Sequence, residues 1–98
     1  MENYKGYKNK ITFDFISSIM NDEDDYITAM DMVKDAVGMF SLTDMLRSWA
    51  NDMADDALTS YQYTHPFIKS VVNSGIAEVD FYEVAETLIT DAKELKEA

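Results

Sequence analysis

Apolar residues recur every three or four positions along most of this 98-residue chain, and no segment alternates apolar and polar residues over the length of a strand. Because an α-helix turns once in about 3.6 residues, this spacing places apolar side chains on one face of successive helices. The pattern predicts helices at about residues 10–20, 22–39, 41–59, 66–75 and from 80 towards the C-terminus. We therefore expect an all-α fold, a compact bundle of about five helices in a single domain over residues 1–98, with residues 1–8 as an irregular N-terminal arm.

Short polar side chains mark the predicted starts of three helices. Asn9 can act as an N-cap, in which a side-chain oxygen accepts a hydrogen bond from an unpaired backbone N–H of the first turn. Ser41 with Asp44, and Asp80 with Glu83, have the three-residue spacing of a capping box. These signals predict that the third helix begins just after Ser41 and the fifth just after Asp80.

The one proline of the chain marks the start of the fourth helix. Pro66 suits the first helical position, where a missing N–H has no consequence, and Thr64 or His65 can then cap the helix. Gly75 suits a helix C-terminus, because glycine readily enters the left-handed conformation that ends many helices. The sequence therefore predicts a short fourth helix. Its apolar side consists of Phe67, Ile68, Val71 and Val72.

The first two predicted helices are more apolar than a surface helix requires. In the first, only Asp14, Ser17 and Ser18 form a polar strip, so this helix must be covered both by the core and by something else. The second carries two neighbouring apolar stripes, as is typical of a helix with two packing partners, and we expect it to be the central element. The stripes are Tyr26, Met30, Val33, Val37 and Phe40, and beside them Ala29, Met32, Ala36 and Met39.

Composition and charge narrow the range of functions. The chain has a formal net charge of −11, and ten carboxylates but only two cations, Lys34 and Arg47, lie between Asp22 and Asp56. Such a surface repels phosphate backbones and anionic membranes, so we expect a partner with a basic surface and no direct contact with nucleic acid or membrane. The chain has no cysteine, no apolar run near the roughly 20 residues of a membrane span and no visible signal peptide. These features predict a cytoplasmic protein.

Catalytic and cofactor motifs are missing from the sequence. His65 is the one histidine, and without cysteine a nucleophilic dyad or triad would have to be built around it. The acidic run from Asp22 matches a calcium loop only in part, because Ile27 stands where such loops need glycine and Val33 where they need glutamate. No glycine-rich phosphate loop and no Glu-x-x-His pair is present. We therefore expect a protein that is not an enzyme and that needs no metal or other cofactor.

The remaining candidate for function is an acidic helical surface. The acids at the start of the second helix have a structural explanation, since negative charge suits the positive end of a helix macrodipole. The later acids lack this explanation, and carboxylates on rigid helices can imitate duplex phosphates in a basic groove. Exposed tyrosines beside them could extend such a recognition surface. The candidate partner-binding residues are Asp31, Asp35, Asp44, Asp52, Asp55, Asp56, Tyr61 and Tyr63. The alternative is that these acids only solvate the surface.

Short segments near both ends resemble a family of small proteins encoded by phages and plasmids. Residues 6–13 read Gly-Tyr-Lys-Asn-Lys-Ile-Thr-Phe and are followed by Asn-Asp-Glu at 21–23 and by Tyr26. The family typically shows Gly-aromatic-x-Asn-x-x-Thr-Trp, an Asn-Asp-Glu run and a tyrosine, then a Val-Asp-aromatic-x-Glu-Ile-Ala stretch that residues 79–85, Val-Asp-Phe-Tyr-Glu-Val-Ala, match. Phe13 replaces the family's tryptophan and Ile11 its acid. The resemblance implies an accessory protein of a mobile element that acts in a bacterial host, and it carries over no catalytic residue.

These observations lead to two hypotheses of different classes. In the first, the chain is a non-enzymatic phage or mobile-element accessory protein that binds a host macromolecule. Its most concrete form is inhibition of a nucleic-acid-binding defence system, of the anti-restriction or anti-CRISPR type, through acidic helices. In the second, the chain is a homo-oligomeric structural or assembly protein of a phage with no host target, as the broad apolar arc of the first helix suggests.

Overall fold

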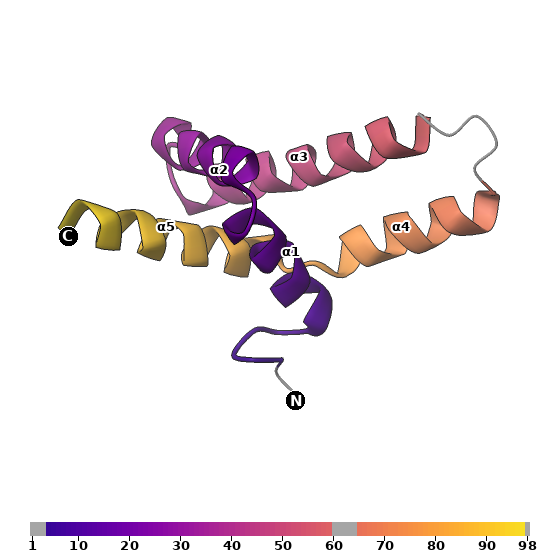
Figure 1. Ribbon diagram of the computed structural model, residues 1–98, viewed down its shortest axis with the longest axis horizontal. Coiled ribbons are helices and arrows are strands. Elements are labelled where there is room, and N and C mark those ends of the chain that lie inside the picture. The colour runs from indigo at the N-terminus through magenta and orange to yellow at the C-terminus, as the bar shows by residue number, and fades with distance from the viewer. Residues whose placement is uncertain (1–3, 60–64, 98) are drawn as a thin grey trace.

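The computed structural model describes residues 4–59 and 65–97, and this part of the chain forms five α-helices (Figure 1). The helices are α1 (Lys10–Met20), α2 (Glu23–Asp35), α3 (Met39–Thr59), α4 (Pro66–Glu78) and α5 (Phe81–Glu97). The predicted all-α fold is confirmed. No helix within the described ranges is both long and apolar enough to cross a membrane.

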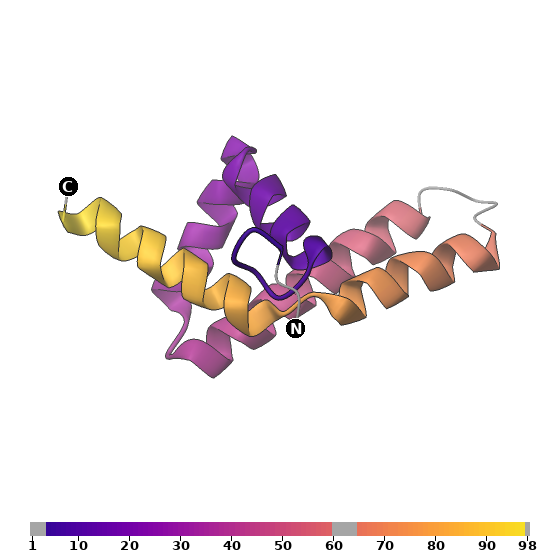
Figure 2. The ribbon, with the colours of Figure 1, turned by 90° about the horizontal axis from the view of Figure 1, so that it is seen from below.

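The hydrophobic core lies where α1, α2 and α5 meet the first half of α3, and we call this part the body. The most extensive helix pair is α3 with α5, while α1 contacts α2, α4 and α5 (Figures 1 and 2). The buried cluster comprises Ile16, Ile19, Ala29, Leu42, Leu46, Ala50, Phe81, Val84, Ala85 and Leu88. The expectation that the second helix is central is wrong, because α2 contributes only Ala29 to this cluster, whereas most of its members come from α3 and α5.

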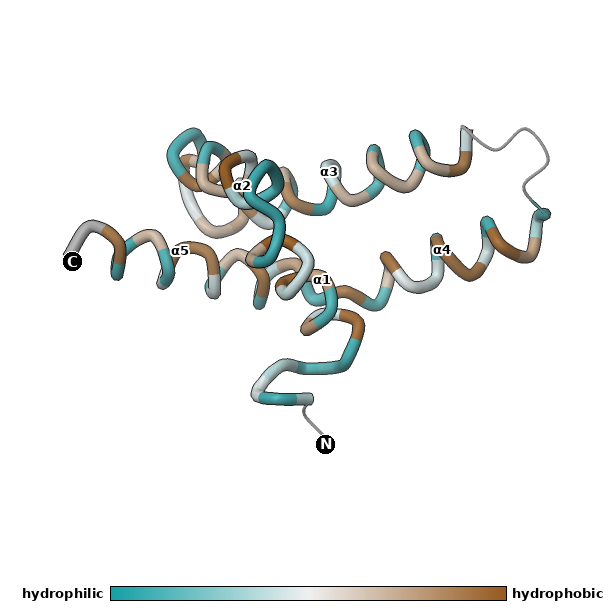
Figure 3. The backbone as a smooth tube through the Cα atoms, in the orientation of Figure 1, coloured by the Kyte–Doolittle hydropathy of each residue, from teal (hydrophilic) through white to brown (hydrophobic). Residues whose placement is uncertain are grey.

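The second half of α3 and the whole of α4 extend beyond the body as an arm, which we define as residues 51–59 and 66–78 (Figure 2). The two helices run side by side along the arm in both views (Figures 1 and 2). Ala54 is the only buried residue of the described arm, and α4 buries none of its residues. Figure 3 shows that hydrophobic positions nevertheless recur along α4. The arm therefore has helical structure with very little core of its own.

The broad apolar arc of α1 is covered in part by the N-terminal residues of the chain. Before α1, Tyr4 and Tyr7 exchange two backbone hydrogen bonds of 2.7 and 2.9 Å. Between them Lys5 and Gly6 take positive φ angles of 49° and 90°, as a type I′ turn requires. The tyrosine rings then lie 5.3 and 6.0 Å from the ring of Phe13. Within the segment expected to be irregular, Tyr4 and Tyr7 thus pack on α1 at Phe13 and cover this part of its apolar arc.

The second helix ends earlier than predicted. α2 stops at Asp35, and Ala36 already has extended backbone angles. Val37 and Phe40, which were expected to face inward on this helix, lie beyond it and are 95% and 79% exposed. Gly38, a residue of low helix propensity, lies two positions beyond Ala36 in the segment that separates α2 from α3.

The third helix accordingly begins earlier than predicted, and the proposed cap at Ser41 is wrong. α3 begins at Met39, and its first hydrogen bond runs from Leu42 N to Gly38 O at 3.0 Å. Ser41 therefore lies inside the first turn and has no unpaired helix end to cap.

The fourth helix begins as predicted but ends later. His65 is its N-cap and accepts a hydrogen bond from Phe67 N through Nδ1 at 3.0 Å, with Pro66 at the first position. Gly75 does not end the helix, which continues for three more residues. A single internal glycine is only mildly unfavourable, and the continued helix brings Ile76 against the core.

The caps of α1 and α5 interlock. Asn9 accepts the predicted N-cap hydrogen bond from Thr12 N at 2.9 Å, and its Nδ2 donates to Glu78 O at 2.9 Å, just before α5. The fully buried Thr12 accepts a hydrogen bond from Asp80 N at 2.9 Å through Oγ1, which itself donates to Asn9 Oδ1 at 2.6 Å. Hydrogen bonds therefore join the N-terminus of α1 to the segment that begins α5.

The predicted capping box of α5 forms only in part for the same reason. Asp80 Oδ1 accepts from Glu83 N at 3.1 Å, as expected of an N-cap. The Glu83 carboxylate does not return to Asp80 N, which is already bonded to Thr12, and instead accepts from Lys8 N at 2.8 Å. Residues of the two segments that suggested a family resemblance thus meet in one structural junction.

A further hydrogen bond joins α2 to α5. Tyr26 Oη donates to Asp91 Oδ2. The carboxylate holds the phenolic proton and raises the pKa of Tyr26 above its usual range, and partial burial and the negative charge of Asp91 act in the same direction.

Candidate functional site on the outer face of α3

Four of the candidate acids lie along the solvent side of α3. They are Asp44, Asp52, Asp55 and Asp56, and all four are exposed. The helix packs on the core through Leu42, Leu46 and Ala50. Because each residue turns a helix by about 100°, Asp44, Asp52 and Asp55 fall on the side away from these core positions, whereas Asp56 lies at the edge of that side, about 40° from the direction of Leu42. At a rise of about 1.5 Å per residue, they extend over roughly 18 Å of the helix axis.

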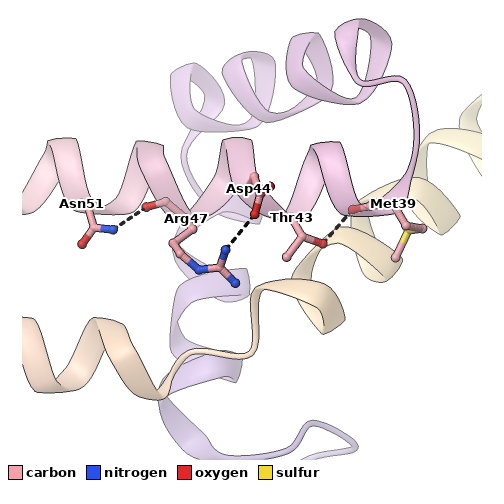
Figure 4. A network of polar contacts seen from close by, with 5 residues as sticks. All are labelled: Met39, Thr43, Asp44, Arg47 and Asn51. Atoms are coloured by element: carbon pink, nitrogen blue, oxygen red, sulfur yellow. Dashed lines mark hydrogen bonds and ion pairs between the residues drawn. The ribbon is translucent and has the colours of Figure 1, made fainter.

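Asp44 is partly neutralised by the one cation of α3. Arg47 Nη1 lies 2.9 Å from Asp44 Oδ1 (Figure 4). The guanidinium of Arg47 also lies 5.6 Å from the centre of the Phe81 ring. Since an exposed ion pair adds little to stability, its main effect here is to offset the charge of Asp44. Asp44 is therefore the weakest of the four as a contact for a basic partner.

The negative charges of Asp52 and Asp55, in the second half of α3, are not offset in this way by any described residue. Asp52 and Asp55 make no ion pair and no side-chain hydrogen bond with any residue that the structure describes. The helix has no Lys or Arg after Arg47. Asp56 lies four residues after Asp52, and like charges at this spacing destabilise a helix.

The helix macrodipole makes the position of these acids less favourable still. α3 ends at Thr59, so Asp56 lies in its last turn and Asp55 immediately before it. The C-terminal end of a helix carries partial negative charge, which repels a nearby carboxylate. The position of Asp55 therefore opposes the stability of the helix, and neither Asp52 nor Asp55 has an ion pair or side-chain hydrogen bond with a described residue that would compensate.

The other candidate residues do not share this face. Asp31 and Asp35 are exposed on α2, one turn apart, with Lys34 beside them. Tyr61 and Tyr63 lie outside the described residues. The structure thus brings together the acids of α3 on one surface and leaves the two acids of α2 on a different helix.

Sequence reasoning missed an exposed apolar surface on α4. Phe67, Ile68 and Val71 belong to the predicted apolar side of this helix and are 66%, 48% and 51% exposed. The sequence feature that indicates this surface is the near absence of charged residues in α4. Residues 66–77 contain Lys69 as their one charged residue, although the chain as a whole has a net charge of −11.

A hollow lies between the N-terminal turn and α5. It has a volume of about 490 Å³, and carboxylates of Glu83, Glu86 and Glu94 line it together with Lys5. Among the described residues, no group of three or more His, Cys, Asp or Glu side chains is arranged to hold a metal ion.

The chemistry open to the outer face of α3 follows from its residue types. Exposed carboxylates on a rigid helix can accept charge-assisted hydrogen bonds from Lys and Arg side chains of another molecule. Comparisons with protein-family models, with curated proteins and with solved structures found no match to the chain.

Proposed function

We propose that the protein is a non-enzymatic binding protein whose outer α3 face contacts a basic surface on a host macromolecule. The observation that carries this proposal is the position of Asp52 and Asp55 in the C-terminal half of α3, where like charges lie within one helical turn, the macrodipole is unfavourable to an acid, and neither side chain has an ion pair with a described residue. Residues that lower the stability of their own element are typical of functional surfaces. A basic partner would convert this repulsion into attraction.

In its finer form, the proposal is that the chain is a phage or mobile-element accessory protein that inhibits a nucleic-acid-binding defence system. Two observations support it. The N-terminal and C-terminal segments resemble small phage and plasmid proteins, and the exposed carboxylates follow one rigid helix over roughly 18 Å, a length that covers several phosphate steps of a nucleic acid strand. An acidic helix of this length suits a groove that normally holds a phosphate backbone.

The proposal is tested with the variant Asp52→Asn/Asp55→Asn and a control with the same change of net charge. Glu86→Gln/Glu94→Gln is that control, because both residues are exposed on α5, away from α3. Proteins are captured from a bacterial host lysate on the immobilised chain, eluted with salt and identified, and the affinity of the captured protein for each form is measured by calorimetry. We expect the α3 variant to weaken binding by about tenfold or more and the α5 variant by less than about twofold.

Equal losses in the two variants would show that only net charge matters, and unchanged binding of the α3 variant would overturn the proposed surface. Competition tests the finer form. Duplex DNA should displace the chain if the partner uses a nucleic-acid groove, and simultaneous binding of DNA and chain would exclude the mimic.

A further inference from the structure

α4 carries an apolar stripe that is exposed at Ile68 and Val71 and half-buried beside α1 at Val72 and Gly75. At about 100° per residue, the stripe runs along one side of the helix. It consists of Ile68, Val71, Val72 and Gly75, with Phe67 at its edge. The opposite side of α4, which carries Asn73 and Ala77, faces α3 across a hollow of about 460 Å³. The helix therefore turns its small and polar side to its neighbour and its apolar side outward.

An open apolar groove continues this stripe towards the body. It has a volume of about 480 Å³ and lies between α1, through Ile11 and Phe15, and α4, through Val72 and Gly75. A Cβ atom added at Gly75 would meet no atom within 4 Å, so the groove is open at this position. Asp14 is the one acid among its described lining residues, and it is paired with Lys10 at 2.7 Å. The groove is thus nearly free of uncompensated charge.

The distribution of charge favours the α4 stripe as the surface through which two copies of the chain can meet. Residues 66–77 carry no acid, whereas the whole chain carries a net charge of −11. Two copies that meet at another surface bring carboxylates together. A second exposed apolar group consists of Phe40 and Tyr82, whose ring centres lie 6.1 Å apart. A contact between two copies at this group would bring acids together, because Phe40 lies one helical turn from Asp44. The α4 stripe is the exposed apolar surface on which like-charge repulsion between copies is least.

We propose that a second copy of the chain occupies the stripe, with the two α4 helices packed antiparallel about a two-fold axis near Val71. Phe67 and Gly75 lie four residues on either side of Val71. In an antiparallel pair centred there, the large ring of Phe67 lies opposite the open position at Gly75 of the other copy, in both halves of the contact. The antiparallel arrangement also opposes the two helix dipoles. This contact does not depend on the acidic face of α3.

Sedimentation equilibrium of the full chain over a range of concentrations tests the proposal. We expect a monomer–dimer equilibrium that added salt strengthens, because salt screens the repulsion between two acidic copies and leaves apolar contact intact. Val71→Asp puts two like charges at the axis and should raise the dimer Kd by about tenfold or more. The matched control is Val37→Asp, because Val37 is 95% exposed and lies outside the stripe, and it should change the Kd less than about twofold. A chain that stays monomeric at every concentration, or that loses the dimer equally in both variants, overturns the proposal.

A cross-link provides a second measurement that does not depend on a destabilising charge. The chain has no cysteine, so Val71→Cys introduces a single thiol near the proposed axis, where Cβ atoms of two copies come close enough for a disulfide. Mild oxidation should convert this variant into a covalent dimer that reductant reverses, whereas Val37→Cys should stay monomeric. A dimer by sedimentation that cross-links in the Val37→Cys variant but not in the Val71→Cys variant would place the contact elsewhere and overturn the assignment to α4.

Discussion

The body and the arm are built from the same kind of amphipathic helix, yet they bury their apolar side chains to very different degrees. Val84 in the body is fully buried, whereas Val71 in the arm is 51% exposed. α3 belongs to both regions, and its Leu46 is fully buried while its Met53, further along the same helix, is 38% exposed. The apolar period therefore predicts that a helix forms, but the number of elements packed around it decides how much of its apolar face is covered.

The same substitution in both regions is the most direct test of this comparison. Val84→Ala should lower the free energy of unfolding by about 2–3 kcal/mol, because it removes two buried methyl groups and leaves a cavity. Val71→Ala should change the free energy of unfolding by no more than about 0.5 kcal/mol, because the lost contact is half exposed and alanine has the higher helix propensity. Urea denaturation followed by circular dichroism measures both values, at low protein concentration so that any dimer is dissociated.

The helix propensity gained on changing valine to alanine is nearly the same at the two positions, so the difference between the variants reports burial alone. Equal losses of stability would show that α4 is packed as tightly as α5, and the distinction between body and arm would then be wrong.

The junction between α1 and α5 supports the body by hydrogen bonds instead of apolar contact. Thr12→Val keeps the shape of this buried side chain but removes the hydroxyl that accepts from Asp80 N and donates to Asn9 Oδ1. We expect the free energy of unfolding to fall by about 1–3 kcal/mol, because a buried N–H loses its partner. Thr28→Val on the exposed side of α2 is the control, since its hydroxyl donates to Asp24 O and water can replace that bond. Comparable losses in the two variants would contradict an essential role of the junction.

The bond between α2 and α5 should appear in the pH dependence of stability. The hydrogen bond to Asp91 raises the pKa of Tyr26 in the folded protein. In the unfolded chain tyrosine titrates near pH 10, so the folded protein keeps the neutral phenol to a higher pH than the unfolded chain does. A group whose pKa is raised by folding contributes stability below its unfolded pKa and loses that contribution as the pH rises through the folded pKa. Tyr26→Phe should therefore lower the free energy of unfolding at neutral pH, because it removes the hydroxyl that donates to Asp91.

The same variant should show a smaller loss of stability than the natural chain above pH 10. Tyr82→Phe, which changes an exposed tyrosine on α5, serves as the control in denaturation measured from pH 7 to 11. If the free energy of unfolding falls equally between pH 7 and 11 in the natural chain and in Tyr26→Phe, the bond between Tyr26 and Asp91 makes no contribution to stability.

The sequence predicted those features that depend on residues two or three positions apart. Asn9, His65 and Asp80 were recognised as caps because each side chain bonds to a backbone N–H within its own helix start. The acids of α3 were likewise expected on or near an outer face, because helical spacing turns Asp44, Asp52 and Asp55 away from Leu42 and Leu46.

Features that depend on distant parts of the chain could not be predicted in this way. The bond from Lys8 N to Glu83 joins residues 75 positions apart, and it is the reason the capping box of α5 is incomplete. The exposure of Phe67 and Val71 has the same origin, because the periodicity of α4 does not reveal that α3 meets its polar side. The break near Gly38 was overlooked since the apolar period continues through it.

The smallest expected effect concerns the acidic half of the arm, and it has the opposite sign. Asp52→Asn/Asp55→Asn relieves repulsion with Asp56 and weakens the conflict with the macrodipole, so the free energy of unfolding should rise by about 0.3–1 kcal/mol. Glu86→Gln/Glu94→Gln, which removes the same charge from α5, should produce less than half of this gain, and added salt should diminish both effects. A gain in stability together with a loss of partner binding is the combination expected of residues kept for contact and not for folding. Loss of stability in the α3 variant would mean that these acids support the arm, and the argument for a binding face there would fail.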